Sequence, residues 1–158
     1  METQTILKTF LFLHLLGLIM IAGSTLINFL NYKQFWKQYA IDREKGIIIM
    51  QIISRLTVLT AIGGVVLILS GIGMMAATRG VFDQFTWFKI KMVILLLLIL
   101  NVVLVGRRNF ARLQKTVKAA GEQSTGVMAY LKRNISRFQY AQITFLLLII
   151  LLSIFKFT

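Results

Sequence analysis

Four long runs of apolar residues, separated by shorter polar segments, dominate the sequence. They cover about residues 6–30, 47–77, 86–106 and 138–157. As helices, all four are long enough to cross the ~30 Å hydrocarbon layer of a bilayer, because a helix rises about 1.5 Å per residue. The pattern therefore predicts four membrane-spanning helices.

Helical spacing also predicts which faces of the first two helices are buried. In the first run, one stripe of residues three or four positions apart carries small and polar side chains: His14, Gly17, Ile21, Ser24 and Asn28. In the second run, a comparable face carries Thr57, Thr60, Ala61, Gly64 and Gly71. Small and polar residues typically face neighbouring helices in membrane bundles. We therefore expect His14 to point into the bundle, and we expect Asn28 and Asn101 to form interhelical hydrogen bonds.

Composition agrees with a single membrane domain. The chain has 158 residues, the length of one domain, and 58% of them are hydrophobic. Its mean hydropathy is +0.80. It contains no proline, so no helix has to kink, and no cysteine, which excludes disulfides, thiolate metal sites and iron–sulfur clusters. We predict one all-α integral membrane domain, a four-helix bundle, over residues 1–158.

The net charge of +13 is distributed unevenly, and the distribution predicts orientation. The segment between the first two runs carries Lys33, Lys37, Arg43 and Lys45. The segment between the last two runs carries Arg107, Arg108, Arg112, Lys115, Lys118, Lys132, Arg133 and Arg137. Basic loops stay in the cytoplasm, so both connections are predicted there and both termini outside. We expect a bacterial cytoplasmic (inner) membrane protein that attracts anionic lipid and does not bind nucleic acid.

The two basic connections carry further structural expectations. The first, residues 31–46, is expected to place its aromatic side chains in a belt at the headgroups: Tyr32, Phe35, Trp36 and Tyr39. In the second, the part up to residue 120 is expected to continue the third helix into the cytoplasm. The part after Gly126 is expected to form a surface helix that leads into the fourth span.

His14 and Lys91 are the main candidate site residues. Ionisable groups are costly in hydrocarbon, so His14 is a functional-site hypothesis by default. It either hydrogen-bonds a carbonyl or serine of a neighbouring helix, ligates haem or a metal, or handles protons. Lys91 lies about 6 Å inward from the start of its helix, in the same outer half of the bundle. It either snorkels to the headgroups or serves as a ligand or counter-ion.

Methionines offer a second kind of site, because thioethers are soft ligands for Cu(I). The candidates beside His14 are Met20, Met74, Met75 and Met92. The alternative is that these side chains fill gaps in the packing. All five acidic residues lie outside the predicted spans, which disfavours a proton-coupled transporter. No nucleophile–base pair, carboxylate pair or phosphate-binding loop is present.

Two motifs resemble a known group of membrane proteins. Leu13-His14-Leu-Leu-Gly17, followed by Ala22-Gly23, is similar to the first helix of the CopD copper-resistance proteins and the HemJ-type protoporphyrinogen oxidases. Trp87-Phe-Lys-Ile-Lys91 and its leucine run resemble the third helix of the HemJ type. The resemblance implies a four-helix fold with b-type haem and makes His14 and Lys91 the essential pair. The second histidine of that family is missing here, which is typical of a divergent relative.

Three functions are consistent with these patterns. The first is a haem-binding membrane protein with a redox role, in which His14 is an axial ligand and Lys91 a second ligand or charge partner. The second is a copper-binding or copper-transporting protein that uses His14, Met74, Met75 and Met92. The third is a non-catalytic bundle that assembles with a membrane partner, or with further copies of itself, through its small-residue faces.

Overall fold

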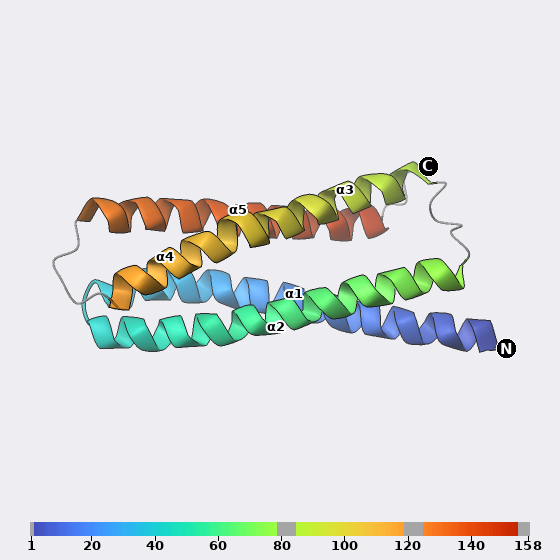
Figure 1. Ribbon diagram of the computed structural model, residues 1–158, viewed down its shortest axis with the longest axis horizontal. Coiled ribbons are helices and arrows are strands. Elements are labelled where there is room, and N and C mark those ends of the chain that lie inside the picture. Colours follow the sequence, from blue (N-terminus) through green and yellow to red (C-terminus); the bar gives the residue numbers. More distant parts are fainter. Residues whose placement is uncertain (1, 79–84, 119–124, 155–158) are drawn as a thin grey trace.

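The computed structural model describes residues 2–78, 85–118 and 125–154, and these are almost entirely helical. Its elements are α1 (Glu2–Tyr39), α2 (Arg43–Ala77), α3 (Thr86–Leu100), the π-helical segment η2 (Asn101–Gly106), α4 (Arg107–Lys118) and α5 (Thr125–Ile154). Because α3, η2 and α4 follow one another without a break, the chain forms four long rods (Figure 1).

The four rods run antiparallel, so the start of α1 and the end of α5 lie at the same end of the bundle (Figure 1). All four are long and apolar enough to cross a membrane. The all-α four-helix prediction is therefore confirmed, and the chain is an integral membrane protein by the length and composition of its helices. Which end faces the cytoplasm stays a prediction.

The rods are longer than the predicted spans. Helix α1 alone has 38 residues, or about 57 Å at the helical rise, against about 30 Å of hydrocarbon. The additional length lies at one end, which we call the basic end (residues 31–55, 107–118 and 125–137). The other we call the terminal end (residues 2–14, 70–78, 86–95 and 145–154). The expectation of a long first connection over 31–46 is wrong, since most of that segment is helix and only three residues separate α1 from α2.

The tight turn at the basic end depends on Asp42 and Gly46. Asp42 caps α2, because its Oδ1 accepts hydrogen bonds from the backbone N–H of Glu44 at 2.9 Å and of Lys45 at 3.3 Å. The hydrogen bond from the Lys45 backbone is the main reason that the pKa of the Asp42 carboxyl lies below its ordinary value of 3.8. Gly46 lies under the Tyr39 ring, and a Cβ there would be 2.7 Å from Tyr39 Cδ2.

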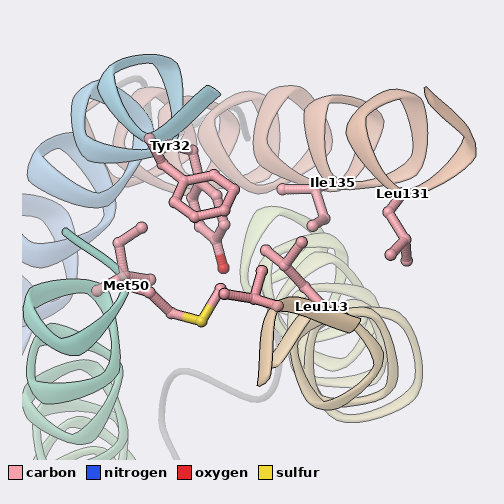
Figure 2. Close-up of a cluster of buried hydrophobic side chains, with 8 residues drawn as sticks. Tyr32, Met50, Leu113, Leu131 and Ile135 are labelled. Atoms are coloured by element: carbon pink, nitrogen blue, oxygen red, sulfur yellow. The ribbon is translucent and has the colours of Figure 1, made fainter. Parts of the chain in front are cut away.

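The hydrophobic core lies at the basic end, where side chains from all four rods meet (Figure 2). It consists of Tyr32, Phe35, Met50, Ile53, Leu113, Val117, Leu131 and Ile135. Two sequence expectations are corrected here. Tyr32 and Phe35 are buried in this core rather than placed in a headgroup belt. The segment after Gly126 is no separate surface helix, because it is the first part of α5 and buries Leu131 and Ile135.

Helices α1 and α2 pack differently outside this core. Gly17 and Gly63 bring the two backbones together, since a Cβ on Gly17 would lie 2.9 Å from the Gly63 carbonyl oxygen. One turn from Gly63 on α2 and two turns from Gly17 on α1, the Ser24 and Thr60 hydroxyls form a hydrogen bond of 2.7 Å across the interface. The predicted stripe on α1 is confirmed. The predicted face of α2 is only partly right, because a Cβ on Gly64 would meet nothing within 4 Å.

Candidate functional site

His14 lies on the terminal half of α1 and is half-buried against α2. Its Nδ1 is 3.1 Å from the Leu67 carbonyl oxygen and 3.1 Å from the Ser70 hydroxyl oxygen. The inward orientation predicted from the stripe is thus confirmed. So are the backbone-carbonyl and serine contacts that one of the alternatives for His14 required.

These two contacts identify the tautomer of His14. A carbonyl oxygen can only accept, so Nδ1 must carry the proton that the Leu67 carbonyl receives. The Ser70 hydroxyl itself donates to the same carbonyl at 3.1 Å, which leaves its oxygen available to accept from Nδ1 as well. A neutral ring in this arrangement has its lone pair on Nε2. Among the described residues, Nε2 has no hydrogen-bond partner.

Gly71 allows the imidazole to lie close to the backbone of α2. A Cβ at this position would be 3.5 Å from His14 Cε1 and 3.8 Å from Nδ1, so a larger side chain would press on the ring. The contacts with Leu67 and Ser70 orient the ring. Metal-ligating histidines are typically held in this way, with one ring nitrogen bonded to a carbonyl and the other directed at the metal.

Lys91 is half-buried and belongs to α3, which pairs with α5. His14 belongs to the other pair, formed by α1 and α2. Within the described residues, Lys91 forms no ion pair, because the ion pair found there joins Lys45 to Asp42 at the basic end. The predicted sharing of one layer by His14 and Lys91 stays a prediction.

The helices around Lys91 do not form a dense core. No residue of segments 86–97 and 143–154 is buried, although both segments are fully described. At the terminal end, α3 and α5 therefore leave His14 and Lys91 only partly buried. This contrasts with the basic end, where α4 and α5 bury several large side chains.

The methionine candidates are spread around the terminal end. Met74 and Met75 lie in the last turn of α2, one turn beyond Ser70, and both are half-buried. Met92 is 44% exposed, and it is about 100° around α3 from Lys91. Met20 packs at the α1–α2 interface against Gly63. A copper site built from His14, Met74, Met75 and Met92 stays a prediction, and no group of three His, Cys, Asp or Glu residues gathers in the described parts of the chain.

A buried polar contact joins the third and fourth rods near the middle of the bundle. Asn101 in η2 donates from Nδ2 to Gln142 Oε1 at 3.3 Å, which confirms the interhelical bond expected for Asn101. Gln139 and Gln142 are 4% and 3% exposed. Sequence reasoning missed these glutamines, although two of them three residues apart in an apolar helix were a usable signal. Asn28 Oδ1 is buried and has no partner in the described structure, so its expected hydrogen bond is not found.

Comparison with models of known protein families, with curated proteins and with solved structures finds no match to this chain. The resemblance to the HemJ and CopD proteins therefore stays a prediction. A function for this chain therefore has to be inferred from the geometry around His14 and Lys91.

Proposed function

We propose that this protein binds haem b in the membrane and that His14 is an axial ligand of the iron. The observation that supports this proposal is the fixed tautomer of His14, whose Nδ1–H is bonded to Leu67 while the Nε2 lone pair remains available. A proximal histidine is the usual protein ligand of b-type haem. The donor chemistry of the site therefore fits the group.

Lys91 supports the same proposal through its charge. A half-buried ammonium in an apolar layer is unfavourable unless an anion or a ligand accompanies it. The described carboxylates lie near helix ends, at Glu2, Asp42 and Glu44. Haem carries two propionates, so Lys91 can pair with one of them as a charge partner, or it can serve as the second axial ligand.

Bound haem would supply one-electron redox chemistry, which makes an electron-transfer or oxidoreductase role the natural one for this site. The chain itself contributes the orientation of His14 through Leu67 and Ser70. It also contributes a cation, expected in the same layer, and an apolar surrounding that limits contact with water. We place the protein in a bacterial cytoplasmic membrane with both termini outside, on the basis of its basic connections. A reporter fused after Thr158 that proves cytoplasmic would overturn this orientation.

The test is an absorbance spectrum of the full-length protein, purified in detergent after expression with added haem. We expect a Soret band that is lost in His14→Gln. Glutamine is the informative replacement, because its amide can still donate to the Leu67 carbonyl but its nitrogen has no lone pair for iron. The thermal unfolding temperature of His14→Gln should therefore stay near that of the haem-free parent protein.

Two results would contradict the haem proposal. One is the absence of a Soret band in the supplemented parent protein, and the other is an unchanged Soret band in His14→Gln. Metal analysis of the same sample separates the copper alternative, which predicts bound copper without a haem spectrum. A protein that lacks both and co-purifies with a stoichiometric membrane partner would favour the non-catalytic assembly.

One observation favours that assembly role as a second candidate. Gly23 and Gly64 lie on faces of α1 and α2 where an added Cβ would meet nothing within 4 Å. Glycines on the outer surface of membrane helices allow another helix to approach closely. Gly64→Ile would then disrupt a complex seen by crosslinking in native membranes, whereas the Soret band would not change.

A further inference from the structure

A hollow of about 300 Å³ opens on the surface of the basic end, between α4 and the first turns of α5. Helix α4 lines the hollow with Arg112, Lys115 and Thr116, and α5 lines it with Val127, Tyr130 and Leu131. Two cations thus face this hollow, and the described residues that line it include no acidic side chain. Such a lining favours an anion over a neutral or cationic ligand.

The chemistry of the lining favours a phosphate. The Arg112 guanidinium presents a planar set of donors that matches two oxygens of a phosphate, and Lys115 adds a second charge. The Tyr130 hydroxyl can donate to a third oxygen, since its side chain is 47% exposed. Leu131 is 2% exposed and gives the hollow an apolar floor that is part of the hydrophobic core.

The hollow lies close to the outer edge of the predicted lipid headgroup layer. Arg112 follows the end of the predicted third span at Gly106 by six residues, or about 9 Å along the helix. Tyr130 precedes the fourth predicted span at Phe138 by a comparable length of helix. The headgroup layer adds about 5–8 Å on each side of the hydrocarbon, and the long Arg112 and Lys115 side chains can extend back to a lipid phosphate at its outer edge.

The core beneath holds the hollow in place. Leu113 and Val117 alternate with the lining residues on α4 and are 0% and 1% exposed, so α4 is anchored against the other helices. Arg43 from α2 donates from Nη2 to the Val117 carbonyl at 2.8 Å and fixes the end of α4. The two cations are therefore mounted on a rigid helix rather than on a loop.

We propose that this hollow is a binding site for a phosphate-bearing anion, supplied either by the headgroup of an anionic phospholipid in the adjoining leaflet or by free phosphate. It is a defined site, in contrast to the general attraction of a basic surface for anionic membranes. It is independent of the haem proposal, because it lies at the opposite end of the bundle.

The experiment titrates the full-length protein in a non-ionic detergent with three probes: short-chain phosphatidylglycerol, short-chain phosphatidylcholine and inorganic phosphate. Binding is measured by thermal shift and by microscale thermophoresis. We expect saturable binding of phosphatidylglycerol, at least tenfold stronger than that of phosphatidylcholine, which carries no net charge. Raising the salt from 50 to 500 mM should weaken this binding, because the lining charges are exposed and are screened.

A matched pair of variants separates a site from diffuse attraction. Arg112→Gln/Lys115→Gln removes both cations of the hollow and should weaken phosphatidylglycerol binding at least tenfold. Arg107→Gln/Arg108→Gln removes the same charge from the same rod, at two exposed positions outside the hollow, and should change binding less than twofold. All four side chains are exposed, so we expect both variants to fold like the parent protein.

The possible results distinguish a lipid site, a site for a soluble anion and diffuse electrostatic attraction. Strong binding of phosphatidylglycerol and not of inorganic phosphate assigns the site to lipid, whereas equally strong binding of inorganic phosphate assigns it to the soluble anion. Equal loss of binding in the two variants would overturn the proposal, because only the overall charge would then matter. No loss in Arg112→Gln/Lys115→Gln, equal binding of phosphatidylcholine, or no binding of any probe would overturn it as well.

Discussion

The two ends of this bundle are held together by different forces. At the basic end, large apolar side chains from four rods form a core in which Phe35, Ile53 and Leu113 are fully buried. Six of its eight residues lie outside the predicted membrane spans. Towards the terminal end, α1 and α2 are joined by glycine contacts and hydrogen bonds instead, and segments 86–97 and 143–154 bury nothing.

The solvent explains the contrast. Burying apolar surface is favourable where the alternative is water, so a core of large side chains forms where the rods extend beyond the membrane. In hydrocarbon, lipid tails are as apolar as leucine, and helices associate through close backbone packing and polar contacts. The same four rods therefore use both kinds of packing along their length.

The largest effect that this comparison predicts is at Phe35. Replacing it by alanine should lower the free energy of unfolding by about 3–5 kcal/mol, the usual range for a buried phenylalanine. The matched control is Phe12→Ala on the same helix, where the side chain is 66% exposed and lies within the first predicted span. We expect that change to stay within about 0.5 kcal/mol. Thermal and chemical unfolding in detergent measure both, and similar losses would contradict the assignment of the core to one end.

The next effect is expected at the glycine contact. Gly63→Ala places a methyl group 2.8 Å from Met20 Cβ, and overpacking of this kind typically costs about 1–3 kcal/mol. Gly64→Ala, one position along, meets no atom within 4 Å. It should be neutral or stabilise the protein slightly, because alanine favours helix over glycine. A stability measurement in which the two variants behave alike would show that the close approach of α1 and α2 is wrong.

A smaller effect is expected from the hydroxyl pair in the same interface. Ser24→Ala removes the hydrogen bond to Thr60, and polar contacts between membrane helices contribute about 0.6 kcal/mol on average. The loss should be several-fold smaller than that of Phe35→Ala. A double-mutant cycle with Thr60→Val checks the pairwise part, and zero coupling would mean that this contact does not stabilise the interface.

The smallest effect is a dependence on pH at the turn of the basic end. The pKa of Asp42 is lowered in the folded state, so its stabilising effect is complete above the ordinary value of 3.8. It is lost as the pH falls through the lower folded-state value. Asp42→Ala should reduce the unfolding temperature at neutral pH and flatten its fall in acid, whereas Glu44→Gln should do neither. A parallel pH profile in Asp42→Ala and the parent protein would contradict the capping role.

Single positions in α1 and α2 show which contacts the sequence predicts and which it does not. The stripe from His14 to Asn28 was correct because the periodicity of a helix is fixed by its geometry. On α2 the same reasoning chose Gly64, while Gly63 makes the contact, and this difference of one position corresponds to about 100° of rotation. Nothing local selects between two adjacent glycines, since either gives the helix a small face.

The basic connections show a second limit. Tyr32 and Phe35 have the composition of a headgroup belt, and basic residues surround them in the sequence. Whether their side chains face lipid or are buried in a core depends on Met50, Leu113 and Leu131, which are far away along the chain. The orientation of the His14 ring likewise needed the Leu67 carbonyl, more than fifty residues later.

The sequence by itself determined that the chain has four helices able to cross a membrane, where its positive charge lies, and which face of the first helix turns inward. These properties follow from residue type and helical periodicity, which act within one segment. Only the tertiary structure decided which end holds the core, which glycine touches α1, and which nitrogen of His14 faces the Leu67 carbonyl. Each of these depends on the rotation and depth of one helix relative to another, and contacts between distant segments fix both.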